Sequence, residues 1–224
     1  MLKINNSSKL ILNYRRLMNT KRCNNFPVIH NEDVAHHSYF VTMMAVLIAK
    51  QYNKSVADHN KNLHHYDDSA LDIFDIPSLY EKGMFHDVEE AFFSDIPRNI
   101  KHHSEEVNKA IEKAVKEKLD QAYEGTGVAG EYSLQCNLEA KSDKEGQLID
   151  IVDMLELGIY CAEEISCGND MMTPLRDKAA RIIRSHAMFE SLFERSEIFE
   201  DLFNLINSDK PLMIATLTES IDIN

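Results

Sequence analysis

Four residues of the chain have side chains suited to holding one divalent metal ion. His37 begins an apolar segment, and the adjacent pair His86 and Asp87 follows about 50 residues later. Asp153 lies within a further apolar segment. Imidazole nitrogens and carboxylate oxygens together suit a borderline or hard divalent ion. Because a buried, unpaired carboxylate is costly, we expect Asp87 and Asp153 to share such a cation with the histidines.

The residue types alone leave this assignment open. The chain has 10 histidines, and a histidine beside a helix core is commonly a hydrogen-bonded structural residue. His-Asp pairs also occur by chance. His36 stands next to His37, and Asp150 precedes Asp153 by about one helical turn, so each neighbour competes for the same role.

The elements that would position these residues are predicted to be helices. Glycine (7) and proline (5) are scarce, and apolar residues recur at helical spacing. We expect an all-α chain without repeats or linkers, with Ser104 as a helix N-cap. Polar residues 51–68 and the glycine-containing stretch 124–137 are predicted loops. The predicted helices cover residues 8–20, 34–49, 78–93, 103–122, 144–166, 174–193 and 196–207.

Charge and composition exclude several function classes. The formal net charge of −13 disfavours nonspecific binding to nucleic acid or to an anionic membrane. No signal peptide or membrane span is visible, and the four cysteines form no C-x-x-C pair. We therefore expect a cytoplasmic protein with reduced thiols, acting on a small molecule.

The order of three motifs resembles a known superfamily. AHHS at residues 35–38, FHDVEEAFFSDIP at 85–97 and IVDML at 151–155 resemble the HD-domain phosphohydrolases, most closely the bacterial 5′-deoxynucleotidase (YfbR-like) branch. The resemblance implies a single HD domain over residues 1–224, a helical bundle with its motif-bearing core at about 10–170 and C-terminal helices at 174–207. It also implies one divalent ion (Co, Mn, Mg, Fe, Ni or Zn), a homodimer, and the metal ligands His37, His86, Asp87 and Asp153.

The same resemblance implies further site residues. Glu90 and Asp95 fall on the family's catalytic carboxylates, while Arg22 and Lys101 fall on its substrate-binding positions. A metal lowers the pKa of bound water and polarises a phosphate, and Glu90 lies within one helical turn of the His86–Asp87 pair. The alternatives are a solvated carboxylate at Glu90, a turn cap at Asp95 and a surface charge at Arg22.

The implied function is a metal-dependent 5′-nucleotidase that removes phosphate from (deoxy)ribonucleoside 5′-monophosphates. One alternative is a dNTP triphosphohydrolase or pyrophosphohydrolase of the same fold, and another is a non-catalytic nucleotide-binding protein. The chain departs from the family at Cys23, where a tryptophan is usual, which leaves the deoxyribose preference open. The segment that contains residues 51–77 is longer than the resemblance leads us to expect, and His59, His64 and His65 in it are predicted to lie in a solvated loop, with a lid as the alternative.

Overall fold

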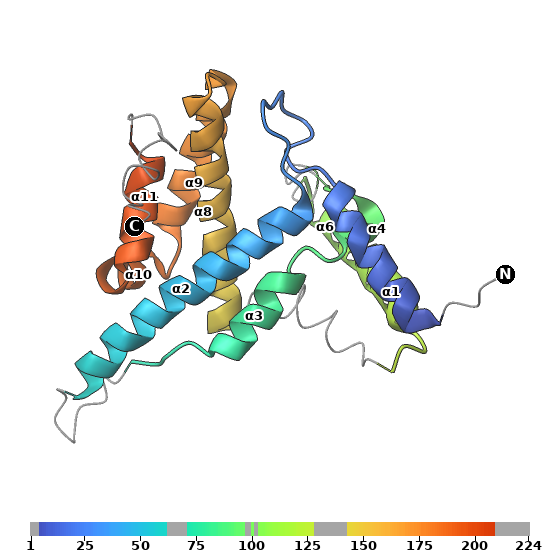
Figure 1. Ribbon diagram of the computed structural model, residues 1–224, viewed down its shortest axis with the longest axis horizontal. Helices are drawn as coiled ribbons and strands as arrows, with labels where there is room; N and C mark the ends of the chain where they lie inside the picture. The colour runs from blue at the N-terminus through green and yellow to red at the C-terminus, as the bar shows by residue number, and fades with distance from the viewer. Residues whose placement is uncertain (1–4, 62–70, 97–99, 101–102, 128–142, 209–224) are drawn as a thin grey trace, which may run out of the picture.

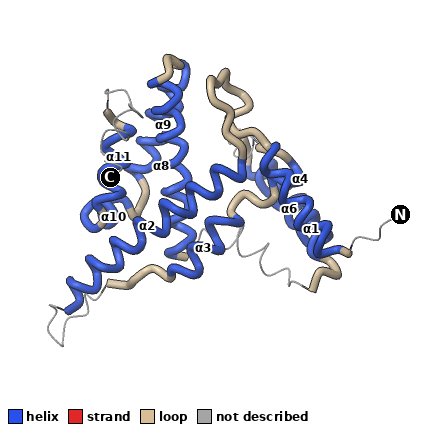
Figure 2. Tube along the Cα trace, viewed as in Figure 1, coloured by secondary structure: helices blue, strands red, loops and turns tan. Residues whose placement is uncertain are grey.

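The computed structural model describes residues 5–61, 71–96, 100, 103–127 and 143–208, and these residues form helices joined by turns (Figure 1, Figure 2). Among the described residues there is no strand, only an isolated antiparallel bridge between Lys21 and Asp33. The predicted all-α class is therefore confirmed. The helices are α1 (Asn6–Tyr14), η1 (Arg15–Asn19), α2 (Val34–Lys61), α3 (Ile76–Phe85), α4 (Glu90–Phe93), α6 (Glu105–Tyr123), α8 (Lys144–Ser166), η3 (Asp170–Met172), α9 (Thr173–Ser185), α10 (Phe189–Arg195) and α11 (Glu197–Ile206).

Helices α2 and α8 cross near the middle of the molecule and carry its main core (Figure 1). Helices α9 and α11 pack on α8, α10 packs on α2 beside α11, and α3 packs along α2. Burial of apolar side chains stabilises this arrangement by about 25 cal/mol for each square ångström removed from water. The largest fully buried core side chains are Phe74, Phe199, Phe203, Ile48, Leu79, Leu148, Ile151, Leu155, Ile183 and Leu192.

A smaller apolar cluster joins α1 to α6 beside the N-terminal end of α2. Leu10 of α1 packs with Val115, Leu119 and Tyr123 of α6. Ser104 begins α6 by accepting a hydrogen bond from the Val107 amide, as predicted for this N-cap. A neighbouring cluster of Leu17, Val34 and Ala91 joins η1 to the start of α2 and to α4.

Helix α2 is longer than predicted, and residues 51–61 are helical rather than a loop. Tyr52 and Val56 continue its buried face into the core. The asparagines that suggested a loop hold an extended segment instead: Asn53 exchanges two hydrogen bonds with the Phe74 backbone, and Asn60 does the same with Leu71. His59 is therefore on a helix, while His64 and His65 lie outside the described residues.

Two predicted helices are each divided in the structure. The helix predicted at 78–93 is interrupted by a turn over residues 86–89, where short-range bonds such as Glu90 N to Asp87 O replace the helical ladder. The helix predicted at 174–193 ends at Ser185, because His186 has an extended backbone and its ring nitrogen accepts from the Met188 amide. The predicted helices at 144–166 and 196–207 are confirmed by α8 and α11.

No helix in the described part of the chain is both long and apolar enough to cross a membrane. Cys23, Cys161 and Cys167 are free thiols, and Cys136 lies outside the described residues.

Candidate metal centre

His37 lies in the first turns of α2 and is fully buried. Its amide donates to the Asp33 carbonyl, which begins the helix. His36 points elsewhere: it is exposed and pairs with the Asp33 carboxylate, with 2.8 Å between Nδ1 and Oδ2. Of the two adjacent histidines, His37 therefore faces the interior, and it is the one that the resemblance assigns as a ligand.

His86 and Asp87 reach the same place from the turn between α3 and α4. The Nε2 atoms of His37 and His86 are 3.1 Å apart. Asp87 Oδ2 is 3.5 Å from His37 Nε2 and 3.3 Å from His86 Nε2. The prediction that this pair sits mid-helix was wrong, and the turn is what brings both side chains to the N-terminal end of α2.

Asp153 completes the group from α8. Its Oδ1 atom is 3.2 Å from His37 Nε2. Asp150, the competing residue one turn earlier, has its Oδ2 atom 4.0 Å from His186 Nε2 instead. The geometry therefore favours Asp153 over Asp150 as the metal ligand from α8.

The hydrogen bonds of the two imidazoles indicate how this group fits a metal ion. His86 Nδ1 donates to the Gly83 carbonyl at 2.7 Å, and His37 Nδ1 donates to the Glu156 carboxylate at 2.7 Å. In the neutral rings both Nε2 atoms then carry lone pairs, which repel at 3.1 Å unless a cation lies between them. Ligand atoms about 2.0–2.2 Å from one ion lie roughly 3.0–3.5 Å apart, which matches the observed separations.

The electrostatics of the group also favour a bound cation. Burial raises the pKa of Asp87 and of Asp153, but the adjacent histidines outweigh burial and hold both pKa values well below the ordinary range. Burial lowers the pKa of His37 and of His86, yet the surrounding carboxylates raise both above the ordinary value. The site therefore strongly stabilises positive charge between these four side chains.

The group is open on one side. His37 has no exposed side-chain surface, whereas Asp87 and Asp153 keep 21% and 22% of theirs exposed. A small molecule can therefore approach from the carboxylate side.

Arg22 lies beside the metal group among three carboxylates. Its Nη1 atom is 2.6 Å from Glu156 Oε2 and 3.0 Å from Glu32 Oε2, and its Nη2 atom is 3.5 Å from Asp153 Oδ1. Burial and Glu156 raise the pKa of Glu32 to about 8 despite the nearby Arg22. Glu32 also lies near His37 and Glu156, but that set already forms a hydrogen-bonded network, so it is a weaker candidate for a metal site.

The loop that carries Arg22 is held against α8. The fully buried Glu164 accepts hydrogen bonds from the Ile29 and His30 amides, each at 2.7 Å. The Tyr160 hydroxyl donates to the His30 carbonyl at 2.7 Å. One face of α8 thus supplies both a candidate ligand and the support for the arginine loop.

Comparison of the sequence with known protein families identifies the family to which this arrangement belongs. The family described as 5′-deoxynucleotidase YfbR-like matches residues 9–201. The chain belongs to this family. A 5′-deoxynucleotidase of Yersinia pestis (strain Pestoides F) is 28% identical over 165 residues, which are 70% of this chain and 75% of the relative. The 5′-deoxynucleotidase of Yersinia pseudotuberculosis (strain YPIII) gives the same values.

Solved structures agree on the fold. An HD-domain phosphohydrolase from Listeria innocua superposes with a TM-score of 0.66 at 21% identity and covers 95% of this chain and 98% of its own. The cyanophage S-2L HD phosphohydrolase, bound to dA and one catalytic Zn²⁺, has a TM-score of 0.53 at 12% identity and covers 88% of this chain and 95% of its own. The predicted HD fold is therefore confirmed for this YfbR-like chain.

Of the remaining predicted site residues, the structure describes Glu90 and Asp95 but not Lys101. Glu90 begins α4 and is buried, with 6% of its surface exposed. Asp95 is half-buried and follows Ser94, whose φ of 62° turns the chain sharply after α4. It lies near the arginine loop, since its charge helps burial raise the pKa of Cys23 to about 11. Lys101 and Pro97 lie outside the described residues. The roles of Glu90, Asp95 and Lys101 stay predictions.

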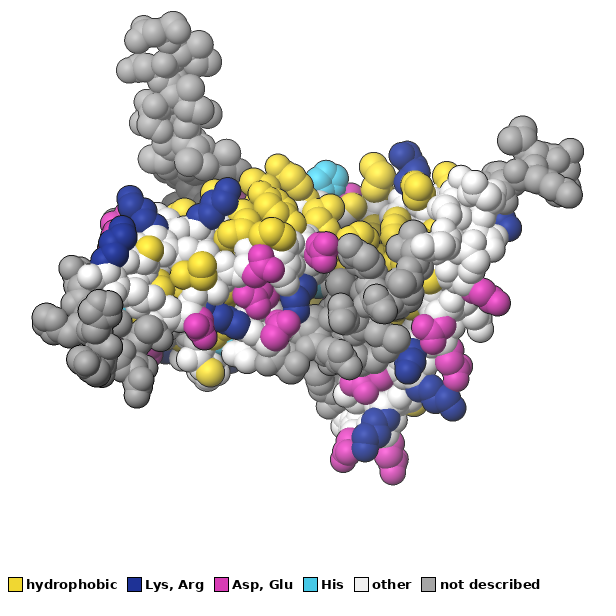
Figure 3. All heavy atoms as spheres, turned by 90° about the horizontal axis from the view of Figure 1, so that it is seen from below, with side chains coloured by type: hydrophobic (Ala, Val, Ile, Leu, Met, Phe, Trp, Pro, Cys, Tyr) yellow, Lys and Arg dark blue, Asp and Glu magenta, His cyan; other side chains and the backbone are white. Residues whose placement is uncertain are grey.

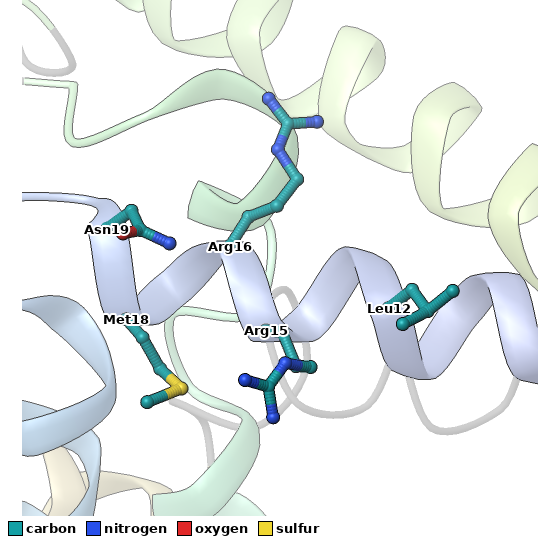
Figure 4. Close-up of a pocket in the computed structure, with 5 residues that line it drawn as sticks. All are labelled: Leu12, Arg15, Arg16, Met18 and Asn19. Atoms are coloured by element: carbon teal, nitrogen blue, oxygen red, sulfur yellow. The ribbon is translucent and has the colours of Figure 1, made fainter.

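A pocket of about 370 Å³ lies elsewhere, along α1 and η1 (Figure 4). Arg15 and Arg16 extend from it in opposite directions in this view. It contains none of the metal-group residues, so we do not assign the active site to it. Its lining residues are Leu12, Arg15, Arg16, Met18 and Asn19.

Sequence reasoning missed Glu156, the buried carboxylate that contacts both His37 and Arg22. A signal was present in the sequence. Glu156 follows Asp153 by three residues inside an apolar helix, so both side chains had to share one face. Tyr160 and Glu164 continue that face.

Proposed function

We propose that this chain is a metal-dependent 5′-nucleotidase that removes phosphate from (deoxy)ribonucleoside 5′-monophosphates. The observation that carries the proposal is the pair of Nε2 atoms facing each other at 3.1 Å beside Asp87 and Asp153. Membership of the YfbR-like family supports the nucleotide substrate. The open carboxylate side gives a small phosphate ester access to the ion.

In this proposal His37, His86, Asp87 and Asp153 hold one divalent ion. The bound ion would act as a Lewis acid on the phosphate and lower the pKa of a bound water. Its identity is undecided among Co, Mn, Mg, Fe, Ni and Zn. The protein's own part is to hold the donors rigidly, which the burial of His37 and the imidazole hydrogen bonds favour.

The other predicted residues would act around the phosphate. Glu90, one residue after the turn that carries Asp87, would orient the attacking water and accept its proton. Asp95 would serve the leaving oxygen, and Lys101 would add positive charge. Arg22 would bind the phosphate through Nη2, which lies on the side of Asp153, because Nη1 is already paired with Glu32 and Glu156.

The test is a substrate panel with a matched pair of variants. Purified protein is loaded with each candidate metal and given dAMP, AMP and dATP, and phosphate, pyrophosphate and triphosphate are all quantified. Asp153→Asn should abolish turnover, whereas Asp150→Asn, one turn away and paired with His186, should retain it.

The outcomes separate the competing functions. Phosphate from dAMP without cleavage of dATP supports the nucleotidase. Triphosphate or pyrophosphate from dATP would favour the alternative dNTP hydrolase. No turnover with any metal, together with measurable nucleotide binding, would favour the non-catalytic alternative.

We also propose that the protein is a homodimer. Large apolar side chains are exposed along α2 and α3, and Figure 3 shows hydrophobic side chains gathered on the face seen from below. Apolar patches of this kind commonly mark interfaces. Light scattering should give twice the chain mass, and Phe40→Glu with Tyr80→Glu should return the monomer. The exposed residues are Tyr39, Phe40, Leu47, Tyr80 and Met84.

The cytoplasmic location and the organisation of residues 1–224 as a single domain stay predictions. Cell fractionation tests the first, and a single cooperative unfolding transition tests the second.

A further inference from the structure

Glu156 is a buried carboxylate that contacts both His37 and Arg22. Its side chain is 7% exposed, and it lies on α8 one turn after Asp153. A single oxygen, Oε2, accepts hydrogen bonds from His37 Nδ1 at 2.7 Å and from Arg22 Nη1 at 2.6 Å. Glu156 is neither one of the four candidate ligands nor one of the residues proposed to act around the phosphate.

The contact with His37 determines which ring nitrogen faces the candidate metal centre. A carboxylate only accepts hydrogen bonds, so in the neutral ring, the form that binds a metal, Nδ1 must carry the proton and Nε2 is left with its lone pair. The negative charge also makes the imidazole a stronger ligand, and the short contact stops the ring from rotating.

The contact with Arg22 adds a second link to the same site. Arg22 Nη2 lies 3.5 Å from Asp153 Oδ1, so Glu156 and Arg22 together connect two candidate ligands. Glu156 is thus placed to align His37 and, through Arg22, Asp153. An ion-pair partner for Arg22 alone would not need to contact His37.

We propose that Glu156 is a positioning residue for the metal centre. It fixes the tautomer of His37 that coordinates through Nε2, and it holds Arg22 next to Asp153. This inference rests on the proposed function, because it assumes that the group binds a metal ion. It goes beyond that function by assigning metal affinity to a residue that is neither ligand nor substrate contact.

A matched pair of conservative variants tests the proposal. Glu156→Gln keeps an oxygen that can accept the hydrogen bond from His37 but removes the negative charge of the carboxylate. Glu32→Gln is the control, since Glu32 also contacts Arg22 Nη1 but the acceptor for His37 Nδ1 is Glu156. Metal affinity is measured by competition with a chromophoric chelator, using Co²⁺ and Mn²⁺.

Glu156→Gln should weaken metal binding about 10- to 100-fold, while Glu32→Gln should change it less than about threefold. The visible absorption of the Co²⁺-loaded Glu156→Gln protein should also shift, because His37 becomes a weaker ligand and the ligand field at Co²⁺ changes. A role confined to folding would lower the thermal midpoint of both variants without moving the Co²⁺ spectrum. Equal metal affinity for wild type and Glu156→Gln would overturn the proposal.

A measurement on the unaltered chain covers the case in which Glu156→Gln does not fold. Long-range ¹⁵N–¹H spectra of histidine-labelled, Zn²⁺-loaded protein should show His37 protonated at Nδ1 and metal-bound at Nε2. A His37 signal from the opposite tautomer refutes the positioning role. Failure of the proposed function looks different, since the wild-type chain would then release no phosphate from any nucleoside monophosphate, whatever its metal affinity.

Discussion

Replacing Gly83 by alanine should move α3 away from α2 and disturb the metal centre without altering any ligand. A Cβ atom at Gly83 would lie 2.6 Å from Thr42 Oγ1 and 3.0 Å from Thr42 Cα. Since the Cα atom belongs to the backbone of α2, it cannot rotate aside. Restoring contacts of 3.4 Å requires α3 to retreat by roughly 0.4–0.8 Å.

The displacement reaches the site through one hydrogen bond. The Gly83 carbonyl accepts from His86 Nδ1 at 2.7 Å, so His86 moves with α3 or loses this bond. Sites of this kind need ligands within about 0.5 Å of their working positions. We therefore expect metal affinity to fall about tenfold.

The effect on stability should be smaller. Overpacking costs about 1–3 kcal/mol, while alanine gains about 1 kcal/mol over glycine in a helix. The free energy of unfolding should fall by about 1 kcal/mol in urea titrations of the metal-free protein.

Gly158→Ala is the control, because its Cβ would also be too close, 2.9 Å from Ile206 Cδ1, but on the side of α8 that packs against α11. It should leave metal affinity within about threefold of wild type while affecting stability. If Gly83→Ala bound metal as tightly as wild type, the coupling of α3 to His86 would be wrong.

Three further predictions concern the surroundings of the site. Arg22→Lys should lower kcat/KM for dAMP at least about tenfold in steady-state assays, because a single ammonium cannot replace a planar fork that contacts Glu156 and other carboxylates; unchanged kinetics would contradict this. Glu164→Ala should lower the free energy of unfolding by about 2–4 kcal/mol in urea titrations, since two backbone amides lose their charged, fully buried acceptor; a change under about 0.5 kcal/mol would show that the loop does not depend on it. Carboxylates raise the pKa of His37 and His86 despite burial, and both rings must be deprotonated to bind metal, so metal uptake should release protons and affinity should increase with pH. Calorimetry in buffers of different ionisation enthalpy measures this release, and pH-independent affinity would contradict it.

The helices with strong apolar periodicity could be predicted from the sequence. α8 and α11 have nearly the predicted bounds, because both bury a continuous face in the core. The far half of α2 was missed, because Asn53 and Asn60 suggest a loop when read locally. Their side chains in fact bind the backbone of a segment that follows later in the chain.

The candidate site was predictable in its residue types but not in its support. The ordered motifs drew attention to His37 and Asp153, and the structure brings their side chains to within 3.2 Å. The turn at residues 86–89 could not be anticipated, because FHDVEEAFF has the composition of a helix. Glu156 was overlooked because its importance depends on contacts with α2 and the arginine loop, which are tertiary.

The central claim is that one divalent ion is held by His37, His86, Asp87 and Asp153. Its most direct test is the metal content of dialysed, metal-reconstituted protein by plasma mass spectrometry, for wild type, His37→Ala and His36→Ala. His36 is the matched control because it is adjacent, exposed and paired with Asp33. We predict one ion per chain for wild type and His36→Ala and none for a folded His37→Ala protein. A wild-type chain without metal, or a His37→Ala chain that keeps its ion, would contradict the account.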